Sequence, residues 1–253
     1  MNRKTWYYRA TDGIRLAVHE TGEGRPLILI HGYFSDAETN WIKFGHAALL
    51  AEAGFRVIMP DLRAHGHSDK PHEPVHYPHD ILADDQIAMI EHLGLTDFDL
   101  GGYSLGGRTV ARMVARGCEP RRAVISGMGL KGLIDTEARS DHFRYVLTNL
   151  GLHERGSPAF MAEAFLKATG GDPVALLGIL DTFVDTPIKA ISAMELPVGV
   201  VCGEDDDDNG SAAALADILT HGQYIEIPGN HMSAVVKPEL GRAIRDYLLG
   251  EVR

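Results

Sequence analysis

The chain has little cysteine and no long hydrophobic run. Its 253 residues include only two cysteines, Cys118 and Cys202, which are far apart and lack metal-ligand spacing. Two free cysteines that form neither a disulfide nor a metal site are typical of a cytoplasmic protein. No stretch approaches the roughly 20 consecutive apolar residues of a membrane span. Arg3 and Lys4 lie near the start, but no apolar segment of a secretory signal follows them. We therefore expect a cytoplasmic protein without a membrane partner.

Basic residues are also scarce. Lys and Arg number 24 against 35 Asp and Glu, a net charge of −11 with histidine neutral. No basic cluster is present to neutralise phosphates, which argues against a nucleic-acid partner. Four consecutive acids, 205–208, supply part of the excess. The hydrophobic fraction of 45% is enough for one globular domain with a substantial core.

The most informative motif is Gly-Gly-Tyr-Ser-Leu-Gly-Gly at 101–107. An apolar stretch precedes it and a helical pattern, 108–115, follows. A strand, a glycine-flanked serine and a helix form the context that a nucleophile elbow requires. Gly102 and Gly106 leave room for the backbones to approach, so the turn can expose the Ser104 hydroxyl. The amides at the start of the helix point at the same spot. The motif predicts a nucleophile at Ser104.

Buried strands alternate with amphipathic helices along the rest of the chain. The first two strands form a hairpin turned at Asp12-Gly13. The predicted strands are 6–10, 14–20, 26–30, 55–60, 98–100, 122–126, 197–202 and 223–227, and the main helices are 41–53, 80–93, 108–115, 211–219 and 238–249. This order predicts an α/β fold with a mostly parallel sheet of about eight strands and helices on both faces. Right-handed crossovers then bring the loops that follow the strands to one edge.

One segment interrupts the alternation, since about 70 residues after Ser126 contain no convincing strand. Helices are predicted at 141–150, 158–168 and 173–184. We expect one domain over 1–253, with a helical lid inserted at about 130–190. Its apolar residues would line a substrate pocket. The candidates are Phe143, Phe160, Met161, Phe165 and Leu177, together with Tyr103 beside the serine.

A serine hydroxyl needs an adjacent base, and histidine is the usual one. Thirteen histidines are available, and position decides between them. His231 follows the last strand and precedes the final helix, so its loop lies on the same edge as the serine. The base needs a carboxylate that fixes its tautomer. The acids Asp205 to Asp208 follow the penultimate strand on that edge. The residues alone barely separate these acids, and Asp206 is the first choice with Asp205 next.

The order serine, acid, histidine is typical of one fold family. The chain resembles the α/β-hydrolase fold superfamily over nearly its whole length, especially the compact carboxylesterases, lactonases and cofactor-free haloperoxidases with short helical lids. Besides the elbow and the His231 loop, residues 31–35 resemble the oxyanion loop and residues 61–68 resemble the segment after the fourth strand. In that family the acid commonly lies three residues after the glycine equivalent to Gly203, which favours Asp206. Ala64 stands where the family commonly has glycine.

The resemblance also implies roles for other residues. The backbone amides of Tyr33 and Leu105 would form the oxyanion hole, and the Tyr33 side chain would edge the pocket. His31 would support the loop and not act as a base. Asp61 and Arg63 would tie loops together. No metal or organic cofactor is implied.

Together these features predict a serine hydrolase that cleaves a small ester or lactone through an acyl-enzyme, with Ser104, His231 and Asp206 as the catalytic residues. Two alternatives stay open. The same three residues could hydrolyse a carbon–carbon bond or support perhydrolysis, or the protein could be a small-ligand receptor with little turnover. The natural substrate and the oligomeric state are not predicted.

Overall fold

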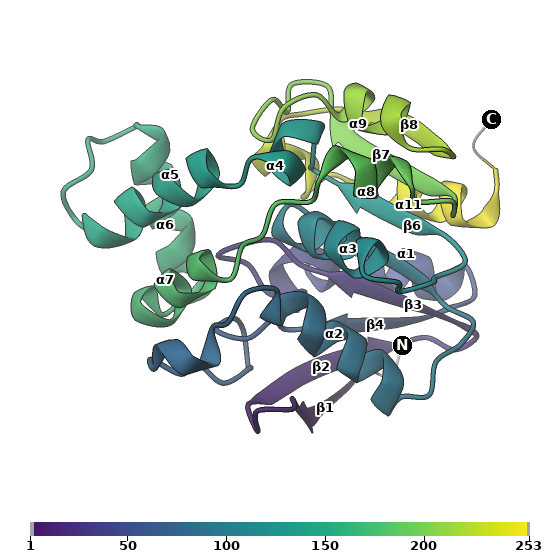
Figure 1. The fold of residues 1–253 in the computed structure, drawn as a ribbon, viewed down its shortest axis with the longest axis horizontal. Coiled ribbons are helices and arrows are strands. Elements are labelled where there is room, and N and C mark those ends of the chain that lie inside the picture. Colours follow the sequence, from purple (N-terminus) through teal and green to yellow (C-terminus); the bar gives the residue numbers. More distant parts are fainter. Residues whose placement is uncertain (1–2, 252–253) are drawn as a thin grey trace.

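The computed structural model describes residues 3–251, so residues 1, 2, 252 and 253 of the predicted domain lie outside the described residues. Eight strands form one sheet in the order β1-β2-β4-β3-β5-β6-β7-β8 (Figure 1). Strands β1 and β2 form the predicted hairpin, β2 pairs antiparallel with β4, and all other pairs are parallel. The strands are β1 (Lys4–Arg9), β2 (Arg15–Thr21), β3 (Arg25–Ile30), β4 (Phe55–Pro60), β5 (Asp99–Tyr103), β6 (Ala123–Ser126), β7 (Val198–Gly203) and β8 (Gly222–Ile227). The predicted mostly parallel sheet of eight strands is confirmed.

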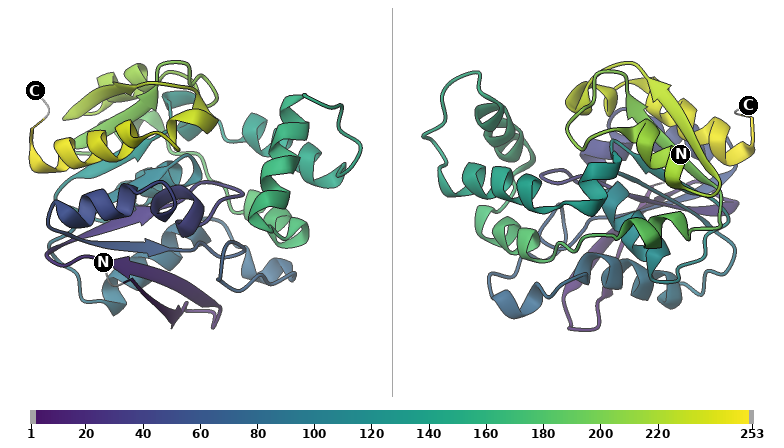
Figure 2. Two further views of the ribbon diagram at one scale, coloured as in Figure 1. Left: turned by 180° about the vertical axis from the view of Figure 1, so that it is seen from behind. Right: turned by 45° about the horizontal axis from the view of Figure 1, so that its top comes forward.

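Helices cover both faces of the sheet, and the pleat of β3 explains why. Leu27 and Leu29 are fully buried in a cluster that also contains residues of α1 (His46–Glu52) and α11 (Pro238–Leu249). Ile28 and Ile30 point the other way, into a cluster shared with α2, α3 and α9. Those helices are α2 (Ile81–His92), α3 (Leu105–Ala115) and α9 (Ala212–Ile218). Figure 1 shows α2 and α3 in front of the sheet, and the left view of Figure 2 shows α11 on the opposite side. A strand buried on both faces needs a continuous apolar run, as β3 has.

A helical insertion of residues 130–192 separates β6 from β7, close to the predicted 130–190. It comprises α4 (Leu130–Ile134), α5 (Glu137–Thr148), α6 (Pro158–Thr169), α7 (Pro173–Asp181) and α8 (Ile188–Ser192). Figures 1 and 2 show α5, α6 and α7 projecting beyond one end of the sheet, whereas α8 returns along it. The five-residue helices α4 and α8 are too short for a recognisable apolar period, so the sequence did not predict them.

The helix predicted over 41–53 is wrong in its first half. The structure has a π-helical turn, η1 (Glu38–Ile42), and then the separate helix α1. Gly45 lies between them with a φ of 83°, in the left-handed region. An α-helix cannot continue through that conformation, which glycine adopts without steric cost. The apolar periodicity continues across this break because η1 and α1 bury the same face, including Trp41 and Leu50.

The helices of residues 3–251 are short. The longest have 12 residues, and none is both long and apolar enough to cross a lipid bilayer.

The buried imidazole of His65 makes the stability of the fold depend on pH. Its imidazole is 3% exposed, its Nδ1–H donates to the Arg63 carbonyl, and burial together with the neighbouring His31 lowers its pKa to about 3. Between pH 6.5 and pH 3 the unfolded chain binds a proton here that the native protein does not bind. The free energy of unfolding therefore falls as the pH falls below 6.5.

We predict that His65→Gln removes part of this pH dependence. When the pH is lowered from 7.5 to 5.5, the free energy of unfolding of the variant should fall by about 1 kcal/mol less than that of the wild type. Urea unfolding at both pH values measures the difference, with His221→Gln as control because that side chain is exposed. Equal pH dependence in the wild type and His65→Gln would contradict the prediction.

Candidate active site

Ser104 occupies a strained turn between β5 and α3. Its φ of 54° and ψ of −113° lie outside the regions that a non-glycine residue prefers. The turn is tight because two glycines touch other backbone segments. A Cβ on Gly102 would lie 2.3 Å from the Gly106 carbonyl carbon, and one on Gly106 would lie 2.0 Å from the Ile30 oxygen. Strain of this kind persists only where the surrounding packing enforces it.

Ser104, His231 and Asp206 form one chain of hydrogen bonds. The Ser104 Oγ lies 2.9 Å from His231 Nε2, and His231 Nδ1 lies 2.9 Å from Asp206 Oδ2 and 3.1 Å from Oδ1. A carboxylate only accepts hydrogen bonds, so Nδ1 carries the proton and Nε2 of the neutral ring accepts from the serine. The three residues follow β5, β7 and β8. The carboxyl ends of these parallel strands meet at one edge, which brings together residues 127 positions apart.

The four acids after β7 differ in where they point. Asp206 is buried, with a side chain 1% exposed, whereas Asp205, Asp207 and Asp208 are exposed. A turn in which the Asp206 amide donates to the Gly203 carbonyl directs the carboxylate inward. The Asp208 amide also donates to Asp206 Oδ1. Asp206 is thus the acid beside His231.

Tyr103 holds the His231 loop in place. As expected from the sequence, it lies on the wall of a hollow beside Ser104, and its hydroxyl also donates to the His231 carbonyl oxygen at 2.6 Å. This contact joins β5 to the start of α10 (His231–Ala234), which Asn230 caps through its side chain. A tyrosine one residue before the serine gave no sequence signal for this supporting contact.

His31 orients the loop that follows β3. The Leu62 amide donates to His31 Nε2, so Nδ1 carries the proton and donates to the Gly32 carbonyl. Complete burial lowers the pKa of His31 and keeps the ring neutral. The ring therefore supports the loop, as the resemblance implies.

The amides of Tyr33 and Leu105 are both available for a ligand. Within residues 3–251 neither N–H donates a hydrogen bond, and Leu105 begins α3, where amides have no partner inside the helix. The loop lies against the serine, since a Cβ on Gly32 would be 3.4 Å from the Ser104 Cβ. Tyr33, Ser104 and Leu105 line the same narrow recess. Two free donors beside one hydroxyl can bind an oxyanion.

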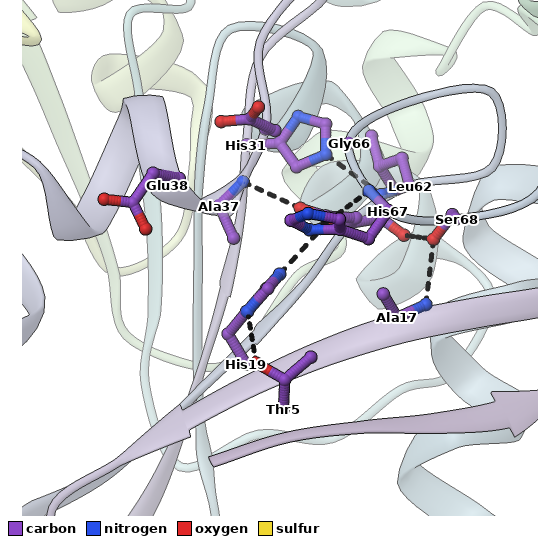
Figure 3. A network of polar contacts seen from close by, with 12 residues as sticks. Thr5, Ala17, His19, His31, Ala37, Glu38, Leu62, Gly66, His67 and Ser68 are labelled. Carbon is purple, nitrogen blue, oxygen red and sulfur yellow. Dashed lines mark hydrogen bonds and ion pairs between the residues drawn. The ribbon is translucent and has the colours of Figure 1, made fainter. Parts of the chain in front are cut away.

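Asp61 ties the surrounding loops together, and Figure 3 labels its partners Ala37, His19 and His67. Its Oδ1 accepts from the Ala37 amide, and its Oδ2 accepts from the His67 amide and from His19 Nε2. Although burial alone would raise its pKa, the hydrogen bonds from His19, from the His67 amide and from the Ala37 amide hold the pKa below its usual range. Ala64, in the same loop, keeps a left-handed φ of 66° although it is not glycine.

His19, Asp61 and His67 could also be considered as metal ligands. Each offers one ligand atom, and these atoms lie within 4.8 Å of one another. However, Asp61 Oδ2 already accepts two hydrogen bonds, and a metal ion there would displace the one that joins β2 to the loop after β4 and the one that closes that loop. We assign this cluster a structural role.

Two hollows meet at Ser104. The larger, of about 670 Å³, reaches under α5 and α6. The smaller, of about 300 Å³, lies toward η1, and the two share Ser104, Phe165, His231 and Met232. Apolar side chains dominate the larger hollow, and those on its wall are Tyr33, Phe34, Phe143, Pro158, Met161, Ala162, Ala164, Phe165 and Met232.

Some of the side chains that the sequence predicted to line the pocket lie on the wall of the larger hollow, and others do not. Phe143, Met161 and Phe165 lie on the wall of the larger hollow, as does the ring of Tyr33, whose hydroxyl donates to the Leu176 carbonyl. Phe160 lies on none of the hollow walls at Ser104, because the helical turn of α6 directs it away from the face made by Met161 and Phe165. Leu177 packs against the core.

The sequence analysis missed the polar part of the wall. Arg139, His142, Asp205, Asp208 and Asn230 contribute to it. Nothing in their local sequence pattern distinguishes them from ordinary surface residues.

The fold and this arrangement define the class: an α/β protein with a serine elbow, a histidine and a buried acid after successive strands. A family model described as alpha/beta hydrolase fold matches residues 25–145. A non-heme haloperoxidase of Rhodococcus erythropolis is 34% identical over 140 residues, which cover 53% of this chain and 48% of the relative. A 2-hydroxymuconate semialdehyde hydrolase of a Pseudomonas species is 32% identical over 116 residues, 46% of this chain and 40% of the relative. The chain thus spans about half the length of the curated relatives it matches.

Solved structures share the fold over nearly the whole chain. An esterase from Exiguobacterium antarcticum superposes with a TM-score of 0.78 at 16% identity, covering 96% of this chain and 98% of the other. At that identity the likeness establishes the fold alone. The protein therefore has the α/β-hydrolase fold, and residues 25–145 match the family model.

The supporting contact of Tyr103 leads to a stability prediction. Tyr103→Phe removes the donor to the His231 carbonyl and leaves a buried acceptor unpaired, which should lower the free energy of unfolding by about 1–2 kcal/mol. Urea denaturation measures this loss. The matched control is Tyr224→Phe, because that exposed hydroxyl contacts only the Glu226 carboxylate and its removal should change stability by less than about 0.5 kcal/mol. Equal effects of the two variants would refute the supporting role.

Proposed function

We propose that the protein is a serine hydrolase that cleaves a small carboxylic ester or lactone through an acyl-enzyme. The observation that carries the proposal is the unbroken hydrogen-bond chain from the Ser104 hydroxyl through His231 to buried Asp206. The serine is attached to a rigid elbow, and the contact to Asp206 favours the His231 tautomer whose Nε2 can take the serine proton.

In this proposal His231 acts first as a base. Its Nε2 takes the proton of Ser104 as the oxygen attacks the carbonyl carbon of the substrate, while Asp206 stabilises the imidazolium that forms. His231 then gives the proton to the leaving alcohol, and an acyl group remains on Ser104. A water molecule deprotonated by His231 releases the acid and restores the serine.

The developing oxyanion would be held by the amides of Tyr33 and Leu105. Both are fixed before substrate binds, Tyr33 by the His31 contact to Gly32 and Leu105 by the start of α3. Donors that need no reorganisation lower the barrier most effectively, by about 3 kcal/mol each.

The helical insertion would act as a lid over this site within a single domain. Phe143 on α5 and Phe165 on α6 face the hollow beside Ser104. Apolar walls favour a small, fairly apolar acyl or alcohol group, and they exclude water from the reaction. The chemistry described needs only these side chains, a small-molecule substrate and water.

A second candidate is carbon–carbon bond hydrolysis on the same three residues. The similarity to a 2-hydroxymuconate semialdehyde hydrolase favours it. The two candidates share the serine and differ in the bond that breaks, so substrate assays separate them.

We expect steady hydrolysis of short-chain p-nitrophenyl esters that Ser104→Ala abolishes, since no other side chain at the elbow can form the acyl-enzyme. The release of coloured nitrophenolate, followed by its absorbance, measures turnover. Equal slow rates for the wild type and Ser104→Ala would refute the esterase proposal and leave a receptor role.

The acid is tested separately. Asp206→Asn should lower kcat by about 10³–10⁴-fold, because an amide no longer holds the reactive tautomer of His231. Asp207→Asn removes a neighbouring exposed charge outside both hollows and serves as the matched control, with a change of less than about threefold expected. A large loss in Asp205→Asn with little loss in Asp206→Asn would overturn the assignment.

A further inference from the structure

Arg108 is a buried arginine without a carboxylate partner. It lies on α3, four residues after Ser104, and is 5% exposed. Its Nε donates to the Gly132 carbonyl at 3.1 Å, and its Cζ lies 4.4 Å from the centre of the Phe183 ring. Among residues 3–251 no acid forms an ion pair with it. The guanidinium charge is therefore not neutralised in the folded protein.

Arg63 shows how the same protein holds an arginine that is purely structural. It is fully buried, and its guanidinium is paired with Asp85 and with Asp12 at 2.8 Å each. Buried charges are normally neutralised in this way, since an unpaired charge is costly to remove from water. Departures from this rule are most often found at functional sites.

The recess beside Arg108 is the place where the oxyanion would form. Its wall includes Ser104 and the two residues with free amides, Tyr33 and Leu105. The recess holds about 10 Å³, which is room for one oxygen atom or one water molecule. Arg108 lines this recess and neither of the two larger hollows at Ser104. Its charge therefore lies beside the oxyanion position and away from the space for the rest of a substrate.

No acid lines the wall of this recess within residues 3–251. Besides Arg108 the charged residue there is Arg139, which pairs with Asp208 at 2.9 Å. The remaining side chains on the wall are neutral and belong to Met128, Phe143, Phe183 and Asn209. Burial first, and then the charge of Arg139, lower the pKa of Arg108 to about 10, so the guanidinium stays charged at neutral pH. The recess is electropositive before any substrate binds.

We propose that the positive charge of Arg108 stabilises the oxyanion that forms when Ser104 attacks the substrate. The negative charge that develops in the recess is the partner that the buried guanidinium lacks in the free enzyme. An attraction that exists only in the transition state raises kcat and leaves substrate binding unchanged. This inference rests on the proposed hydrolase function, and it adds a charged group to the two backbone donors.

The charge is close enough to act across the recess. Arg108 follows the oxyanion donor Leu105 by three residues, about 4.5 Å along the helix axis. Two unit charges about 6–10 Å apart, at an effective dielectric constant of about 20, attract each other enough to change a rate by roughly 10- to 100-fold. Because Arg108 is buried, water and salt screen this attraction little.

Arg108→Met tests the proposal by kinetics. It should lower kcat for p-nitrophenyl butyrate by about 10- to 100-fold and change KM by less than about twofold. KM is spared because the bound ester is uncharged and because acylation and deacylation both pass through an oxyanion. Arg108→Lys keeps the charge and should restore most of kcat. Initial rates over a range of ester concentrations give both constants.

Arg116→Met is the matched control, because it removes a positive charge from the end of the same helix. Arg116 lies about two turns beyond Arg108, is exposed and pairs with Asp84 at 2.6 Å. Its replacement should leave kcat unchanged. Arg108→Met should also have a thermal midpoint equal to or above that of the wild type, because an apolar side chain replaces an unpaired buried charge. A structural role for Arg108 predicts the opposite shift.

n-Butylboronic acid tests the same charge without turnover. The Ser104 oxygen adds to boron and its proton passes to His231, which leaves a tetrahedral boronate with a negative charge beside the two amides. Isothermal titration gives the affinity. Arg108→Met should weaken boronate binding by about the same factor by which it lowers kcat. Ser104→Ala, which cannot form the adduct, shows how much of the binding depends on the anion.

The outcomes separate this inference from the hydrolase proposal. Hydrolysis that depends on Ser104, with kcat and boronate affinity unchanged in Arg108→Met, would overturn the role of Arg108 and leave the hydrolase function standing. Equal losses of kcat in Arg108→Lys and Arg108→Met would overturn it as well, because the charge would then not matter. A wild type that neither hydrolyses esters nor binds the boronic acid would overturn the hydrolase function, and this inference with it.

Discussion

The geometry of the site depends on the close approach of three backbone segments at the elbow. Gly102 and Gly106 have no space for a Cβ, because each is in contact with the backbone of another segment. These contacts hold the end of β5, the start of α3 and the end of β3 together. They also hold Ser104 in a conformation that a free chain would avoid. The hydroxyl and the Leu105 amide therefore keep fixed positions, and other groups can be arranged around them.

The groups around the serine are each held by a partner outside the reaction. Tyr103 donates to the His231 backbone, His31 donates to the Gly32 carbonyl, and Asp61 joins the loops on either side of His31. Such contacts place a donor or a base without using its reactive atoms. The helical insertion contributes differently, because it supplies the apolar wall and the Arg139 side chain. Rigid strand ends thus carry the hydrogen-bond chain, while the insertion shapes the space for a substrate.

The elements that the sequence predicted well are those whose signal is local. Each strand of the parallel sheet is a short apolar run between turn residues, and α11 was predicted over the residues it occupies, Pro238–Leu249. The prediction of helices failed where a left-handed backbone conformation interrupts a continuous apolar pattern, as at Gly45. It also failed where a helix is shorter than two turns, as in α4. At the site, Phe160 was expected on the pocket wall and lies off it, because one step along a helix rotates a side chain by about 100°.

The sequence by itself determined the serine elbow, the order of strands and helices and therefore the edge at which serine, acid and histidine meet. It could do so because glycine spacing and apolar periodicity act over a few residues. Only the tertiary structure decided which of four consecutive acids faces His231, and that Tyr103 supports the histidine loop. It alone placed Arg108 beside the serine without an ionic partner. These outcomes depend on contacts between segments distant in the chain, and local patterns carry no information about the direction in which such a side chain finally points.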